Sequence, residues 1–203
     1  MKKIFYLCFT LFLAVLLIGL LPVKSEAAIY DNVLRLHVIA NSDSDEDQSL
    51  KLAVRDKILE NVARLVSDTK SFHEANTILS KKENLESLTL AAKEVISAAG
   101  YDYNVSVSIG KEKYPRKSYE ALCFPSGSYT SLRVQIGEAI GQNWWCVLFP
   151  RLCLGAATKN ENEESFIEAG FTPEQYRIVT ETEEPVYEVR FKILEIIEET
   201  FGE

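Results

Sequence analysis

The feature that most limits the fold is an apolar run near the N-terminus. Ile4–Leu21 carries no charged side chain, follows two lysines, and is followed by a proline and a group of small residues. A short positive segment, an apolar segment and a small-residue cleavage site, in that order, are typical of an export signal. We therefore predict a signal peptide over residues 1–27, cleaved after Ala27, and a folded extracytoplasmic domain over residues 28–203.

The same run could instead stay attached as an uncleaved membrane anchor. Its 18 residues lie at the lower limit for crossing a bilayer, and no basic cluster follows Lys24 to stop transfer. Either alternative places residues 28–203 outside the cytoplasm. Without residues 1–27 the formal net charge changes from −8 to −10, because three lysines and one glutamate are lost. A domain with this net negative charge lacks the positive electrostatic potential that nucleic-acid binding requires, so we expect no nucleic-acid partner.

The hydrophobic pattern after the signal first predicts a strand and then helices. Alternating residues over Val33–Ala40 predict the strand. Apolar residues at three-to-four spacing then predict a helix from Asp45 and a second helical region from Phe72. The second region is interrupted near Ser80–Asn84, and Gly100 is its natural end.

Alternation returns after the helices and predicts a sheet. A strand is expected over Tyr103–Ile109, and two more over Ser118–Phe124 and Tyr129–Ile136, joined as an antiparallel hairpin at Pro125–Gly127. An acidic loop at Asn160–Ser165 and a last helix over Pro185–Phe201 complete the chain. This order predicts a single α+β domain with a mainly antiparallel sheet of about four strands packed by helices.

An acidic cluster resembles the start of a calcium-binding loop but does not complete it. Asp43, Asp45 and Asp47 have the right spacing, whereas Gln48 stands where the loop needs glycine and Val54 where it needs glutamate. Capping of a helix N-terminus explains the same residues. With two histidines and no C-x-x-C pair, the sequence predicts no metal site and no cofactor.

The residues form no recognisable catalytic motif. His37 could act as a general base, but no nucleophile is evident beside it in the sequence. The enzyme alternative is a cysteine nucleophile at Cys146 working with His37 and Asn41. Three such residues, far apart along the chain, are easily found by chance, so we expect the chain not to be an enzyme.

The most apolar segment of the predicted domain is Asn143–Cys153. Export favours disulfide formation, and we expect Cys146 and Cys153 to pair, leaving Cys123 as the odd thiol. We expect a stapled loop that presents an aromatic anchor to a partner. The alternative is a loop packed wholly into the core.

Two adjacent tryptophans, Trp144 and Trp145, lie in this segment. In an extended segment they would point to opposite faces, so that one could fill the core while the other stands at the surface. An exposed tryptophan is a common anchor for a protein partner.

Two segments of the chain occur in the same order in a known family. One is L-R-L-H-V-I-A-N-S-D-S at Leu34–Ser44, and the other is N-W-W-C-V-L-F-P at Asn143–Pro150. Together with Leu132-Arg133-Val134 they resemble the stage II sporulation protein R family of endospore-forming bacteria, over about residues 33–153. Family members commonly carry proline where Asp45 and Arg151 stand here.

The resemblance implies a signalling protein exported from the forespore into the space between forespore and mother cell. There it would activate a membrane-bound aspartic peptidase, which processes the precursor of the sporulation factor sigma-E. Contact with the membrane would occur only through the signal segment or the partner. The family supplies no catalytic residues, and a secreted hydrolase acting on cell wall or peptide is the alternative function. The candidate partner-binding residues are Trp144, Trp145, Asn143, Arg35, His37 and Arg133.

Overall fold

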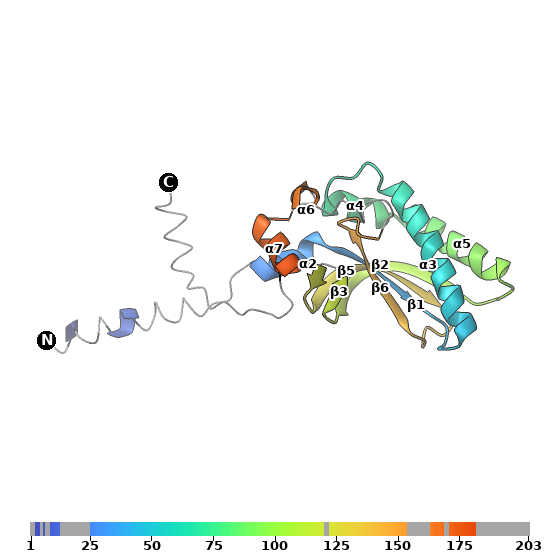
Figure 1. Ribbon diagram of the computed structural model, residues 1–203, viewed down its shortest axis with the longest axis horizontal. Coiled ribbons are helices and arrows are strands. Elements are labelled where there is room, and N and C mark those ends of the chain that lie inside the picture. Colours follow the sequence, from blue (N-terminus) through green and yellow to red (C-terminus); the bar gives the residue numbers. More distant parts are fainter. Residues whose placement is uncertain are drawn as a thin grey trace.

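A mixed four-stranded sheet forms the centre of the computed structural model (Figure 1). Its strands lie in the order β2 (Val105–Tyr114), β5 (Gly127–Ile136), β1 (Leu34–Ile39) and β6 (Asn143–Phe149). Strand β1 pairs in parallel with β5 and antiparallel with β6, and β5 pairs antiparallel with β2. Two of the three pairings are antiparallel, which confirms the predicted α+β class.

The structure describes most of the residues between 25 and 181 and a few before them. The described residues are 3–4, 6, 9–12, 25–119, 122–153, 163–168 and 171–181. The predicted helix over Pro185–Phe201 and most of the predicted signal peptide therefore lie outside the described residues. Within the described ranges, no helix combines the length and the apolar character needed to cross a bilayer.

Three helices lie on one side of the sheet (Figure 1). They are α3 (Asp45–Leu65), α4 (Phe72–Leu79) and α5 (Lys82–Ala98). Their boundaries follow the sequence pattern, because Ser44 caps α3 and Gly100, at φ +85°, follows the end of α5. The core lies between these helices and the sheet, and its buried side chains include Leu36, Val38, Val54, Ile58, Val62, Leu88, Ile96, Leu132 and Val134.

Three short helices gather at one end of the sheet (Figure 1). They are α2 (Ser25–Asn32), α6 (Glu163–Glu168) and α7 (Pro173–Glu181). Helix α2 packs against β5 and α7, and its Ile29 is fully buried. The expected acidic loop at Asn160–Ser165 was wrong for its last three residues, which begin α6 with glutamates that favour a helix N-terminus.

The hairpin expected around Pro125–Gly127 was also wrong. Two short strands stand before it, β3 (Lys117–Tyr119) and β4 (Leu122–Phe124), which pair with each other in a separate sheet. Strand β5 pairs instead with β2, over all ten residues of each strand. Because β2 continues to Tyr114, pairing with it satisfies far more backbone groups of β5 than a three-residue partner could.

Asp47 fastens the end of β1 to the start of α3. Its carboxylate accepts hydrogen bonds from Asn41 Nδ2 at 2.7 Å and from Ser42 Oγ at 2.6 Å, although the residue is only 4% exposed. Burial by itself raises the pKa of Asp47, but hydrogen bonds from Ser42, Asn41 and Tyr103 outweigh it and hold the pKa below the usual value. Asp47 therefore closes the loop between the two elements, while the helix itself is capped by Ser44.

A second loop is bound to the same cluster. The backbone N–H of Glu138 donates to Asn41 Oδ1 at 3.0 Å, and that of Gln142 donates to Asp43 Oδ1 at 2.7 Å. Gly137 has φ +58°, and a Cβ added there would collide with the side chain of Asn41. The loop between β5 and β6 is thus shaped to fit against residues 41–43.

The first prediction concerns the stability that Asp47 supplies. Because its folded pKa lies below the usual value of 3.8 for an aspartate, ionised Asp47 stabilises the fold above about pH 4, and this contribution is lost as the pH falls further. Asp47→Asn should lower the unfolding free energy at pH 7 by about 1–3 kcal/mol and weaken the fall in stability as the pH drops below about 4. Urea unfolding followed by circular dichroism measures both effects.

Asp68→Asn is the matched control, because Asp68 is exposed in the turn after α3. Its unfolding free energy should stay within about 0.5 kcal/mol of the wild type. Equal stability of Asp47→Asn and Asp68→Asn at pH 7 would show that Asp47 does not fasten the two elements.

Candidate partner-binding face

The alternation of β1 divides its side chains between the two faces of the sheet. Leu34, Leu36 and Val38 point to the helices, whereas Arg35 and His37 point to the opposite side, here named the second face. Residues in register share a face, so Arg133 of β5 and Trp145 of β6, the two partners of His37, also belong to the second face. Asn143, in register with Ile39 and bonded to His37, lies on the same face, so the structure brings five of the six candidate partner-binding residues together and only Trp144 points to the other side.

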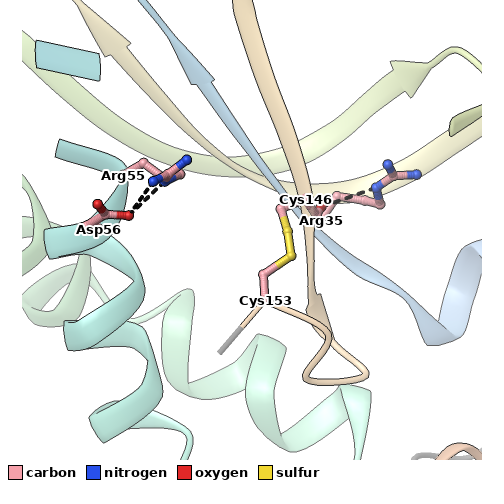
Figure 2. The surroundings of a disulfide bond; sticks show 5 residues. All are labelled: Arg35, Arg55, Asp56, Cys146 and Cys153. Atoms are coloured by element: carbon pink, nitrogen blue, oxygen red, sulfur yellow. Dashed lines mark hydrogen bonds and ion pairs between the residues drawn. A yellow bond between two sulfur atoms is a disulfide. The ribbon is translucent and has the colours of Figure 1, made fainter. Parts of the chain in front are cut away.

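Arg35 lies at the buried end of the second face. It is fully buried, and its guanidinium stands 4.2 Å from the ring centre of Tyr114, 5.0 Å from Tyr129 and 5.5 Å from Phe124. Its Nε donates a hydrogen bond to the carbonyl of Cys146 at 3.3 Å, and Figure 2 shows the side chain directed away from the disulfide. Arg35 therefore stabilises the aromatic layer of this face and does not reach the surface.

His37 joins three strands through its ring nitrogens. Nδ1 lies 2.8 Å from Oε1 of Glu112 on β2, and Nε2 lies 2.7 Å from Oδ1 of Asn143 on β6. The imidazole is 7% exposed, with the ring of Trp145 5.7 Å away. A neutral imidazole donates from one nitrogen only, so the direction of the bond to Asn143 depends on the orientation of its amide.

The three residues of the enzyme alternative are not assembled into a site. Cys146 forms a disulfide with Cys153, and its side chain lies on the face opposite His37. Asn41 donates to Asp47 and accepts from the backbone of Glu138. His37 thus has a carboxylate and an amide as hydrogen-bond partners, and Cys146 cannot act as a nucleophile while it is in the disulfide.

The two tryptophans point to opposite faces. Trp144 stands on the helix side, where the guanidinium of Arg55 lies 4.3 Å from its ring centre, and it is 36% exposed. Trp145 stands on the second face, where Lys117 Nζ lies 4.3 Å from its ring centre. Each ring is therefore covered by a cation and only partly buried, unlike a tryptophan packed wholly into the core.

The segment that carries the tryptophans is a strand for most of its length. The expected loop over Asn143–Cys153 was wrong for Asn143–Phe149, which form β6 along β1. Tryptophan, valine and phenylalanine favour extended backbone, and β1 would otherwise lack a partner on this side. Residues 150–153 turn back beside β6, where the N–H of Cys153 donates to the carbonyl of Val147 at 3.2 Å.

A disulfide joins Cys146 of β6 to Cys153 of this turn, with 6.4 Å between their Cα atoms (Figure 2). Arg151, between them, donates to the carbonyl oxygens of Val66 and Thr69 after α3. Cys123 is a free thiol that accepts a hydrogen bond from Arg116 Nε at 3.0 Å. Across the described residues, no group of three or more histidine, cysteine or acidic side chains could hold a metal ion.

Three residues of the second face escaped the sequence analysis. Glu112, Tyr114 and Lys117 lie beyond Ile109, where we expected the strand to end. The run G-K-E-K-Y that completes β2 lacks alternating apolar residues, because the two positions that continue the apolar face of Val105–Ile109 carry lysine. Extending the period of two by five residues would have placed Glu112 and Tyr114 on one face.

The comparisons with known proteins agree with the resemblance seen in the motifs. A family model described as stage II sporulation protein R matches residues 30–159, a range that includes the whole sheet, the second face and the disulfide. Stage II sporulation protein R of Bacillus subtilis (strain 168) is 35% identical over 180 residues, which cover 81% of this chain and 79% of the relative. No solved structure matches. The chain therefore belongs to the stage II sporulation protein R family.

Proposed function

We propose that this chain is a secreted sporulation signal that activates a membrane-bound aspartic peptidase, which then processes the sigma-E precursor. Family membership supports a role in stage II of sporulation. The observation that carries the finer proposal is the second face, where aromatic and cationic side chains stand together without a nucleophile in contact with His37 among the described residues. Such a face suits recognition of another protein better than bond cleavage.

The contacts of His37 support a ligand rather than an enzyme. A general base needs a proton to abstract from a nucleophile within hydrogen-bond reach. Here Glu112 and Asn143 occupy the two ring nitrogens. One is a carboxylate and the other an amide, and neither is a nucleophile that a base would activate. The imidazole thus connects strands, and its contacts among the described residues do not favour a secreted hydrolase.

Two features support export. The apolar run Ile4–Leu21 has the composition of a signal, and the domain carries a disulfide between Cys146 and Cys153, a bond typical of oxidising compartments. Cleavage after Ala27 would leave Ile29, the buried anchor of α2, with the domain. The secreted product would then lie between forespore and mother cell, as its partner requires.

Co-expression in a bacterium that does not sporulate tests this function. The chain, the membrane peptidase and the sigma-E precursor are produced together, and the processed fraction of the precursor is measured by immunoblot. Processing should require both the chain and the catalytic aspartate of the peptidase. Equal processing with and without the chain would refute the proposal, and processing by the chain with an inactive peptidase would identify the chain as the protease.

The second prediction is that the segment before Ala28 is needed for delivery and not for folding. Deletion of residues 2–27 should leave a folded cytoplasmic protein, because Ile29 and the core remain. In the co-expression assay this form should drive no processing of the precursor by the peptidase, whereas the same deletion fused to an unrelated cleavable signal should restore processing. Precursor processing driven by the deleted form, with its location in the cytoplasm shown by fractionation, would contradict export.

The third prediction separates a ligand from an enzyme at His37. Glutamine can keep one hydrogen bond to Glu112 or Asn143 but cannot act as a general base. For a ligand, His37→Gln should change activation only as far as it changes binding to the peptidase or the amount of folded protein. Binding to detergent-solubilised peptidase and precursor processing are measured on the same preparation, with thermal unfolding as the folding control.

The contrary result would be a His37→Gln protein that folds and binds like the wild type yet activates nothing. Loss of function without loss of stability or affinity is the signature of a residue that acts in a chemical step. That result would restore the enzyme alternative.

A further inference from the structure

Strand β6 forms one edge of the sheet, with β1 as its paired strand. The hydrogen bond from Cys153 N–H shows that the carbonyl of Val147 points away from β1, toward this edge. Because inward and outward backbone groups alternate along an antiparallel strand, the N–H and C=O groups of residues 145 and 143 point to the same edge as those of Val147. Cys153 thus covers the edge at Val147. The edge along residues 143–145, here named the half-edge, lies outside this contact.

The side chains beside this half-edge differ from those that usually protect an edge strand. Natural edges are commonly blunted by lysine, proline or a bulge near their exposed groups. Here the edge is flanked by Trp144 on one face and Trp145 on the other, and Asn143 at the start of the strand is exposed. Two amphipathic rings on opposite faces would contact alternate side chains of any strand placed along β6.

Two cations on the second face lack acidic partners in the part of the chain that the structure describes. Lys117 over Trp145 and Arg133 beside His37 form no ion pair with a carboxylate among the described residues. Residues 28–203 nevertheless have a formal charge of −10, by removal of three lysines and a glutamate from the chain total of −8. Cations left without acidic partners on an acidic protein complement an acidic ligand.

We propose that the first half of β6 accepts an extended, acidic segment of the membrane peptidase as an added strand. The backbone of residues 143–145 would supply main-chain hydrogen bonds, the two tryptophans would contact side chains on each face, and Lys117 would meet a carboxylate. This inference rests on the proposed function, since the peptidase is the partner that it names. It assigns the contact to the strand edge, in place of the loop that the sequence suggested.

A pair of substitutions at Asn143 tests the main-chain contact. Both Asn143→Ala and Asn143→Pro remove the side chain that bonds His37, but only proline also removes the outward N–H. Proline is tolerated at the first residue of an edge strand when its N–H faces outward. Asn143→Pro should therefore bind detergent-solubilised peptidase about tenfold more weakly than Asn143→Ala, with a matching loss of precursor processing.

A charge reversal tests the chemistry of the partner and remains informative if the proline variant does not fold. Lys117→Glu should weaken binding about tenfold, whereas Lys117→Arg should bind like the wild type, because arginine, like lysine, can stack on the ring of Trp145. Lys113→Glu is the matched control, because Lys113 is exposed on β2 and its alternation places it on the face opposite Glu112. It should bind like the wild type.

The possible outcomes separate the two proposals. If wild-type protein drives no processing, the proposed function fails at that step. If wild-type protein drives processing while Asn143→Pro matches Asn143→Ala and Lys117→Glu matches Lys113→Glu, the strand-edge inference alone is overturned. A wild-type dimer in light scattering that Asn143→Pro dissociates, with processing unchanged, would assign the edge to a second copy of the chain and also overturn it.

Discussion

The second face of the sheet depends on the burial of one charge, the guanidinium of Arg35. It projects from the central strand β1 and is fully buried. A buried cation is costly unless polar or aromatic groups surround it. Here the rings come from Tyr114 of β2, Phe124 of β4 and Tyr129 of β5. The last residue of β2 and the β3–β4 hairpin thus supply two of the three rings around Arg35.

Local sequence patterns predicted the individual helices and strands well, but they predicted the pairing between distant strands poorly. The strand at β1, the helix from Asp45 and the break near Ser80–Asn84 each depend on neighbouring residues, such as the Ser44 cap. The hairpin at Pro125–Gly127 failed because β5 had a longer partner in β2, whose last residues carry lysine rather than apolar side chains. Which strand pairs with β5 depends on contacts between residues far apart in the sequence, and a local pattern does not contain them.

The candidate site was predicted in part for the same reason. Adjacency of Trp144 and Trp145 fixes their opposite directions in any extended segment, so that inference needed no tertiary information. Whether Arg35 reaches the surface depends on rings from three other strands, and the sequence could not show that they cover it. Glu112 was missed because its only link to His37 is spatial, across the intervening strand β5.

The two motifs shared with the family meet at the start of β6. Gln142, just before the strand, donates its N–H to Asp43 and accepts from Lys51 Nζ at 3.1 Å. Asn143 then contacts His37, so both residues are held by the segment that contains β1 and the start of α3. The first motif therefore fixes the position of the second. An edge held in this way loses little conformational freedom when a partner binds, which favours recognition by a rigid strand edge over a flexible loop.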